Sequence, residues 1–344
     1  MNDFFPSIYG NDDLRSRLGA SVIQGHFPHA LLIEGKEGSG KKTFATLLSA
    51  ALCCEKKNAA VLPCTECPAC KKILNRLCVD VTYIDREDRA TIGIEKIRDM
   101  RADMHLSSTE MQNKIYIVDH AEALTPEAQN ALLVSIEEPP PHVFVFLLAT
   151  RSDTVLPTIK SRVQTVKMQC FSAIELERYL IAASPAARKL KDEDDRTFQT
   201  VLLAADGTIG RALSLLDSKA TASLMQEREI TDSILNALTA KASYSTLSKR
   251  LALLPTKRQE LLSSLTELTK ALRDLLVLKR DEEAELIYHT DREGAKEVAE
   301  SLSILYLLEL YSAVSDAEFA CTFNANISSL LSSLPNDLYT RRFV

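Results

Sequence analysis

The chain has 344 residues, of which 46% are hydrophobic and 26% charged, and its formal net charge is −6. This length suits two or three domains, and the composition is that of an ordinary folded protein rather than a disordered one. The acidic balance argues against a protein that coats DNA through bulk charge, because such binding needs many Lys and Arg side chains to neutralise phosphates. Any contact with nucleic acid is therefore expected to be local or shared with partners.

Membrane association is not expected. No apolar run in the sequence approaches the roughly 20 residues that a transmembrane helix needs. The first residues lack the basic region and long apolar core of a secretory signal. We therefore expect a cytoplasmic protein.

The first informative stretch is a phosphate-binding loop. A helical segment near 12–24 is followed by the apolar run Ala30–Ile33, which suits a buried strand, and an amphipathic helix starts after residue 43. Glycines between them let backbone N–H groups fold around an anion at the positive end of the helix, and a lysine supplies a point charge. The residues expected to form this nucleotide site are Gly35, Gly38, Gly40, Lys41, Lys42 and Thr43.

One position departs from the phosphate-loop motif. The motif has Ser or Thr directly after the lysine to ligate Mg²⁺, whereas Lys42 stands there and Thr43 follows one residue late. One residue along a helix is a rotation of roughly 100°, so Thr43 is not expected to replace the missing ligand, and a second ammonium opposes a divalent cation. The sequence predicts an intact nucleotide-binding fold with damaged metal chemistry, and it leaves open whether ATP or Mg²⁺ still binds.

A cysteine cluster follows the first helix of this region. Two overlapping Cys-x-x-Cys units lie in one short loop, and two further cysteines precede it. This spacing lets three thiolates converge on one tetrahedral centre, which a fourth closes as a structural zinc site. The expected ligands are Cys54, Cys64, Cys67 and Cys70, with Cys53 as the alternative fourth ligand.

The next elements alternate between strand and helix. A strand is expected near 79–84, a helix over 92–104, and a strand at 115–118 that ends in Asp119, as a Walker B strand does. His120 stands where hydrolytic proteins of this layout have a glutamate that orients water, and Glu122 would have to reach back around a turn. This arrangement predicts that Asp119 lies at the nucleotide site but that hydrolysis is impaired.

The same alternation continues to about residue 168. Thr125 suits an N-cap, Pro126 the first helical position, and the three prolines at 139–141 end that helix. An apolar strand is then expected at 143–148 and a final strand near 163–168. Alternating helices and near-continuous apolar strands predict a parallel sheet covered by helices on both faces.

Taken in order, these motifs resemble the bacterial clamp-loader AAA+ family of DNA polymerase III, and within it the delta-prime subunits most. The resemblance covers about the first 215 residues and is weak beyond. The stretches that carry it, besides the degenerate phosphate loop and the cysteine cluster, are Ile115–Asp119, Ala128–Leu133, Glu137–Pro140, Leu147–Thr150 and Ser161-Arg162.

The resemblance implies roles for three further residues. Thr150 occupies the sensor-1 position, and Arg211 lies in a segment similar to sensor 2 of a helical lid. Arg162 would be an arginine finger donated to the ATP site of an adjacent subunit, although Val163 stands where the family usually has cysteine. A guanidinium supplied in trans suits this role, because it stabilises charge on the transferring phosphoryl group.

The remaining chain is predicted to be helical. Leucine-rich spacing runs from about 221, the acidic run 281–285 is expected to be a solvated helix end, and a last helix pair is expected over 295–334. The resemblance implies an AAA+ domain over 1–170 with a zinc module at about 54–70, a lid over 171–220, and a helical collar over 221–344 that joins subunits.

Three functions are compatible with these features. The favoured one is a largely non-hydrolysing AAA+ stator, without polymerase chemistry of its own, that assembles with gamma/tau-like ATPases and delta and meets the sliding clamp and primer-template DNA through the complex. The first alternative is an active gamma/tau-like ATPase in which Thr43 and Glu122 serve in altered geometry. The second is a zinc-containing DNA-binding scaffold, although the cysteine loop lacks the aromatic residues that stack on bases.

Overall fold

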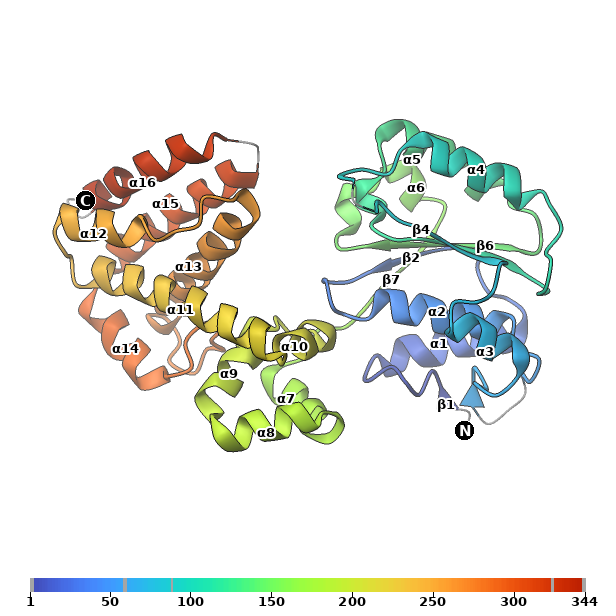
Figure 1. The fold of residues 1–344 in the computed structure, drawn as a ribbon, viewed down its shortest axis with the longest axis horizontal. Coiled ribbons are helices and arrows are strands. Elements are labelled where there is room, and N and C mark those ends of the chain that lie inside the picture. The colour runs from blue at the N-terminus through green and yellow to red at the C-terminus, as the bar shows by residue number, and fades with distance from the viewer. Residues whose placement is uncertain (1–2, 58–60, 88, 323–324, 342–344) are drawn as a thin grey trace. The chain divides into compact units, whose positions relative to one another are not determined.

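The computed structural model describes residues 3–57, 61–87, 89–322 and 325–341. The chain divides into two compact units, which are considered separately. Unit 1 comprises residues 1–172 together with 208–211, and unit 2 comprises residues 173–207 together with 212–344. Figure 1 labels their helices and strands.

Unit 1 is built on a parallel sheet with the strand order β4-β5-β6-β2-β7. The register pairs Leu32 of β2 with Leu147 of β6 on one side and with Thr165 of β7 on the other. The strands are β2 (Ala30–Glu34), β4 (Val81–Ile84), β5 (Lys114–Val118), β6 (Val143–Ala149) and β7 (Gln164–Lys167). The expected parallel sheet is therefore confirmed.

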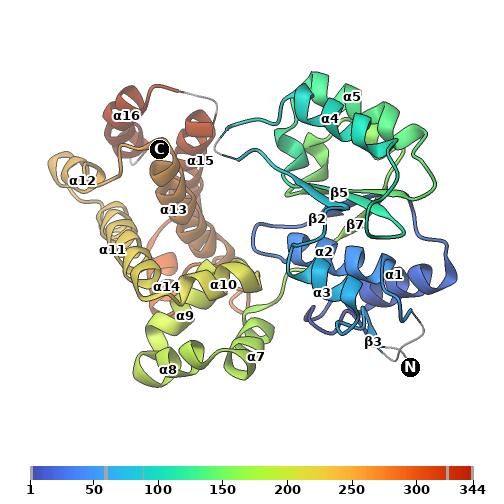
Figure 2. The ribbon, with the colours of Figure 1, turned by 45° about the vertical axis from the view of Figure 1, so that its right-hand side comes forward.

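Helices cover both faces of this sheet (Figures 1 and 2). Alternate residues of each strand enter different apolar clusters, so that Leu31 packs with α1, α2 and α3, whereas Leu32 packs with α4, α5 and α6. The six helices are α1 (Asp12–Gln24), α2 (Lys41–Leu52), α3 (Pro68–Leu74), α4 (Ile94–Met104), α5 (Pro126–Glu137) and α6 (Pro157–Lys160). Burial on both faces is why the inner strands β2, β5 and β6 read as near-continuous apolar runs.

Local sequence signals set several boundaries in unit 1. Thr125 caps α5, because its hydroxyl accepts a hydrogen bond from the N–H of Ala128 at 3.2 Å, and Pro126 is the first helical residue. Short 3₁₀ turns follow β5 and β6, at Ala121–Ala123 and Ser152–Thr154. A second, two-stranded parallel sheet joins β1 (Asp3–Phe4) to β3 (Val61–Leu62), which the sequence did not predict.

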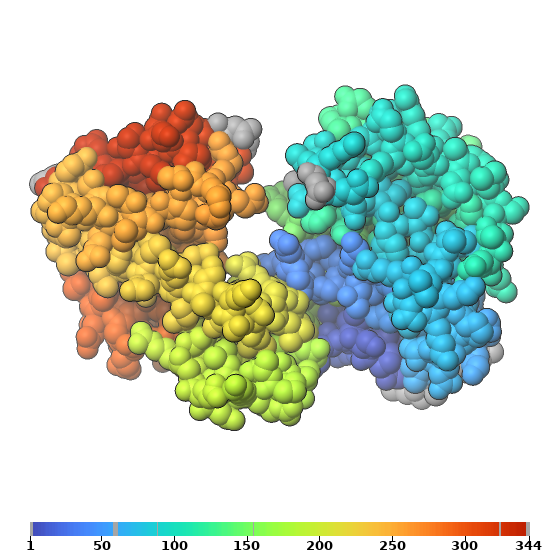
Figure 3. Space-filling view, in the orientation of Figure 1, coloured from blue at the N-terminus to red at the C-terminus, as the bar shows by residue number. Residues whose placement is uncertain are grey.

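Unit 2 is helical in all its described elements. Its long helix α11 contributes Leu224 to a small apolar cluster with α9 and Leu235 to the larger cluster, in which α13 and α15 pack together. Figure 3 shows one face of unit 2, formed by α8 and α9 (yellow-green), α11 (yellow), and α12 and α16 (orange to red). The helices are α7 (Ala173–Ala183), α8 (Pro185–Glu193), α9 (Asp195–Ala204), α10 (Ile209–Leu215, which begins in unit 1), α11 (Ser218–Thr239), α12 (Tyr244–Leu251), α13 (Arg258–Leu278), α14 (Arg292–Ser301), α15 (Ile304–Thr322) and α16 (Ile327–Thr340).

The C-terminal region corrects one expectation. The last helix pair predicted over 295–334 is three helices, α14, α15 and α16, because the chain turns at the buried, extended residue Leu302. The acidic run 281–285 follows the end of α13, and its acidic side chains are exposed. Among the described residues no single helix is long and apolar enough to cross a membrane; α14 and α15 reach that composition only as a pair bent by 107°.

Candidate nucleotide site and metal centre

The phosphate loop connects β2 to α2 and has the backbone conformation that its glycines allow. Gly38 and Gly40 have φ values of 76° and 91°, a region that side-chain-bearing residues rarely adopt. Gly40 is the N-cap of α2, whose first N–H groups have no intrahelical acceptor. These donors and the positive end of the helix dipole therefore face the place where an anion would lie.

The side chain of Lys41 stabilises this loop through hydrogen bonds. Its ammonium donates hydrogen bonds to the carbonyl oxygens of Gly35 at 2.6 Å and Lys36 at 2.9 Å. Burial lowers the pKa of Lys41, whereas the carboxylates of Glu122 and Asp119 act in the opposite direction. Two carbonyl oxygens of the loop therefore already accept hydrogen bonds. The N–H groups of the loop and the positive charge of Lys41 remain to bind an anion.

Lys42 forms an ion pair with Asp119, the carboxylate that the sequence predicts at the nucleotide site. Its Nζ lies 3.0 Å from Oδ2 of Asp119, a residue at the end of β5, while Oδ1 of Asp119 accepts the N–H of His120 at 3.1 Å. Thr43 is exposed. Mg²⁺ does not fit this donor set, because an ammonium rather than a hydroxyl follows Lys41 and it already holds the carboxylate that the metal shell would use.

Glu122, the candidate replacement for a water-orienting glutamate, is held by other side chains. Its Oε1 accepts hydrogen bonds from the Thr150 hydroxyl and, at 3.3 Å, from the Thr150 N–H, and it lies 3.6 Å from Nδ1 of His120. His120 has a left-handed backbone with φ 57°, which starts the turn that brings Glu122 back toward the end of β6. The sequence did not predict this pairing of Glu122 with Thr150, the residue that the resemblance places at sensor 1.

The segment 208–211 lies against the phosphate loop within unit 1. The N–H of Gly210 donates to the carbonyl of Gly38 at 2.9 Å. A Cβ atom at Gly38 would stand 2.6 Å from the Arg211 nitrogen, and one at Gly210 would stand 2.7 Å from the Gly38 oxygen. Both glycines are thus required for the contact, which brings Arg211 beside the loop.

Arg162 is exposed just after α6. Its Nε lies 2.6 Å from Oε1 of Glu137, at the end of α5, and its Nη1 donates to the carbonyl of Thr158 at 3.0 Å and to the hydroxyl of Ser161 at 3.2 Å. The Arg162 side chain is 41% exposed. Its guanidinium is therefore oriented by neighbouring groups and remains accessible from solvent.

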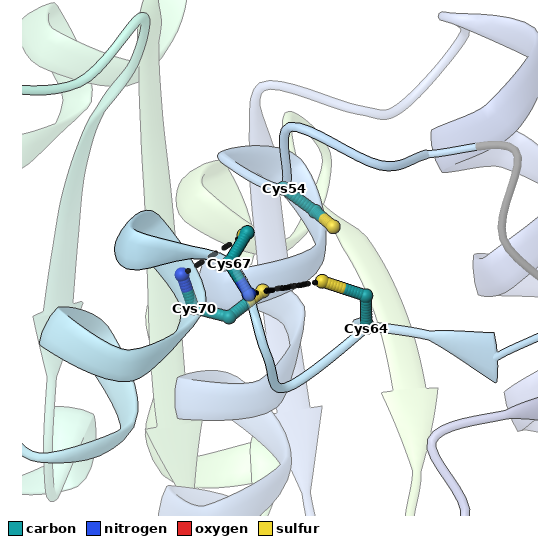
Figure 4. Close-up of side chains that lie close together, drawn as sticks. All are labelled: Cys54, Cys64, Cys67 and Cys70. Carbon is teal, nitrogen blue, oxygen red and sulfur yellow. Dashed lines mark hydrogen bonds between the residues drawn. The ribbon is translucent and has the colours of Figure 1, made fainter.

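The structure brings four cysteines together, and Figure 4 shows their side chains converging from the end of α2, the loop after β3 and the start of α3. Their sulfur atoms all lie within 4.8 Å of one another, and all four residues are buried. Cys67 and Cys70 donate their N–H groups to the preceding cysteine sulfurs of the loop at 3.4 Å. The members of this cluster are Cys54, Cys64, Cys67 and Cys70.

The chemistry of this donor set fits zinc. Four converging thiolates leave no open coordination position, which suits a structural rather than a catalytic ion. Burial raises the pKa of Cys54 and of Cys70; at Cys64 burial acts in the same direction, but the N–H groups of Cys67 and Glu66 bring its pKa down to about 7. Cys53 lies outside the cluster: its Sγ faces the carbonyl of Asn113 at 3.9 Å, and burial raises its pKa to about 12.

Comparison with known proteins bears on the N-terminal part of the chain. Residues 10–172 match the family described as "DNA polymerase III, delta subunit". This part of the chain is similar to that family, although the match covers less than half of the chain. The DNA polymerase III subunit gamma of Buchnera aphidicola subsp. Acyrthosiphon pisum (strain APS) is 31% identical over 214 residues, and DNA polymerase III subunit tau of Bacillus subtilis (strain 168) is 33% identical over 214 residues.

These alignments leave much of each protein unmatched. Each spans 62% of this chain, but only 58% of the gamma subunit and 37% of the tau subunit. Among solved structures, a gamma subunit-related protein of Thermotoga maritima shares 18% identity and a TM-score of 0.40, over 95% of this chain and 99% of that one. A likeness at that level does not bear on function, so a proposal for the function of this chain depends on the site itself.

Proposed function

We propose that this chain is a delta-prime-like subunit of the clamp loader, a stator that does not hydrolyse ATP. The ion pair between Lys42 and Asp119 carries the proposal, because it puts a protein ammonium where hydrolysis needs a divalent cation. His120 in place of the water-orienting glutamate, and Glu122 bound to Thr150, support it. Each change alone leaves a route to turnover, whereas together they remove both the metal and the water-orienting group.

In this proposal Arg162 acts in trans. The chain would assemble with gamma/tau-like ATPases and delta, and would present the accessible guanidinium to the ATP site of a neighbour. It would thereby take part in loading the sliding clamp on primer-template DNA in the cytoplasm. The proposed lid (171–220) and collar (221–344) would connect it to the other subunits. A structural zinc ion held by the four clustered cysteines would tie the end of α2 to α3.

An active gamma/tau-like ATPase is the second candidate, because the curated relatives described above are gamma and tau subunits. It requires Asp119 to release Lys42 and Glu122 to release Thr150 before metal and water can be held. The DNA-binding zinc scaffold gains no such support: Lys72, beside the cysteine loop, is paired with Glu110 at 3.1 Å.

Steady-state ATP hydrolysis distinguishes the candidates. The purified chain should be inactive alone, and Arg162→Ala should abolish the activity of the one partner site that receives this residue, a loss on the order of 10³-fold or more at that site. Arg151→Ala is the matched control, because Arg151 is also exposed and also paired with a carboxylate, that of Asp153. Turnover by the isolated chain that disappears with Lys41→Ala would overturn the stator and establish the ATPase.

A further inference from the structure

The side chain of Lys42 is held in one place by two independent groups. Besides the 3.0 Å contact with Asp119, its Nζ lies 5.9 Å from the centroid of the Tyr83 ring. The Tyr83 hydroxyl is hydrogen-bonded to the Thr46 hydroxyl at 2.9 Å, and Thr46 donates in turn to the carbonyl of Lys42 at 2.8 Å. The Lys42 side chain is 33% exposed, so one side of the ammonium remains available.

The surrounding charges favour an anionic ligand without a metal. Asp119 accepts one hydrogen bond from Lys42 and one from the N–H of His120, so both of its oxygens are already engaged. A divalent cation entering here would meet the ammonium at short range and would have to displace it from the carboxylate. A polyphosphate instead meets Lys41, the remaining donors of Lys42 and the first N–H groups of α2, all of which attract negative charge.

We propose that the phosphate loop binds a nucleoside triphosphate as the metal-free anion, with Lys42 as its resident cation. This inference deepens the proposed function and rests on it in one respect, that the site does not hydrolyse what it binds. In a metal-dependent site Mg²⁺ bridges phosphate oxygens and the protein. Here the ammonium of Lys42, which pairs with Asp119, would also contact the phosphate, so Mg²⁺ would compete with the protein for the nucleotide.

The experiment is a titration of the full chain with N-methylanthraniloyl-ATP, followed by fluorescence anisotropy in excess EDTA and in excess Mg²⁺. The wild-type chain should bind about tenfold more tightly in EDTA, which corresponds to one charge-assisted hydrogen bond. Lys42→Thr restores a hydroxyl at the metal position and frees Asp119, so Mg²⁺ should now strengthen binding. Lys42→Met should weaken binding in both buffers, and Lys71→Met, an exposed lysine on α3, should change neither.

Thermal unfolding of each variant confirms that it is folded before its affinity is compared. Stronger wild-type binding in Mg²⁺ than in EDTA would overturn the inference, and so would equal binding in both. Absence of binding in both buffers would overturn it as well. None of these outcomes would contradict the proposed action of Arg162 on a neighbouring site, because the hydrolysis assay tests that action separately.

Discussion

Substitution of the buried residue Asp274 offers the clearest test of which interactions stabilise unit 2. This α13 carboxylate is fully buried, and its oxygens accept the N–H groups of Ile287, Tyr288 and His289 at 2.8 to 3.1 Å. The guanidinium of Arg273 donates to Oδ1 at 2.9 Å. One negative charge therefore fixes the backbone of the segment between α13 and α14, and Asp274→Asn replaces one acceptor oxygen with a donor that faces other donors.

The expected loss follows from these contacts. Hydrogen bonds to a charged group contribute roughly 1.5–3 kcal/mol each, and they are not additive when they share one oxygen. Removing one partner from a buried charged network costs about 3–5 kcal/mol. Because the amide keeps one acceptor and the same volume, we expect Asp274→Asn to lower the free energy of unfolding of unit 2 by about 3 kcal/mol. At about 2–4 °C per kcal/mol for a unit of this size, the melting temperature should fall by roughly 6–12 °C.

The same network predicts a pH dependence. Burial by itself would raise the pKa of Asp274, but the contact with the His289 ring and the backbone N–H groups of Tyr288, His289 and Ile287 outweigh it and lower the pKa. A carboxyl whose pKa is lower in the folded state stabilises the fold above its unfolded pKa of about 3.9, and this stability is lost as pH falls through the folded value. The difference between wild type and variant should shrink in that acidic range.

Calorimetry of the full chain at pH 7, repeated at decreasing pH, measures both effects. Asp316→Asn is the matched control, because Asp316 is an exposed residue of α15. A melting temperature within about 2 °C of the control would show that the carboxylate does not hold this segment. A difference that stays constant into the acidic range would show that its charge is not what matters.

Two further substitutions test unit 1. Cys70→Ser should abolish the binding of one zinc ion per chain and should lower the melting temperature of unit 1, as a chelator should. Cys170→Ser, at an exposed cysteine, should change neither the zinc content nor the melting temperature. Mass spectrometry measures the metal content, and an unchanged zinc content in Cys70→Ser would show that Cys70 is not a ligand. Thr125→Ala removes the N-cap of α5 and should cost about 1 kcal/mol in denaturant unfolding, whereas Thr125→Ser keeps the hydroxyl and should cost much less. Equal losses for Ala and Ser would show that the cap does not contribute.

Residue patterns predicted the elements that depend on local sequence. Strand β6 is apolar along its whole length and β2 is apolar up to its last residue, Glu34, and Thr125 with Pro126 marked the start of α5. The two-residue strands of the small sheet could not be predicted, because two residues show no periodicity and their pairing joins segments about 60 residues apart. The division between α14 and α15 was missed because the buried Leu302 continues the apolar pattern through the turn.

The sequence predicted which residues lie at the nucleotide site, but not which side chains they contact. The motif showed that Lys42 opposes a metal, yet its partner Asp119 lies 77 residues further along the chain. The pairing of Glu122 with Thr150 likewise depends on strands that meet only in the folded sheet. The spacing of a motif predicts which residues contribute to one type of site. Which partner each of their side chains contacts depends on how the folded chain packs.

The two ion pairs of unit 1 differ in how easily they separate, and this difference bears on the proposed function. Arg162 and Glu137 are 41% and 44% exposed, and an exposed pair contributes only about 0–1 kcal/mol, so a phosphate of a neighbouring subunit would release the guanidinium at little cost. Lys42 and Asp119 are 33% and 16% exposed, and Lys42 is also positioned by Tyr83. Because separating the second pair leaves a partly buried carboxylate without its cation, the chain is better suited to donating an arginine than to recruiting a metal of its own.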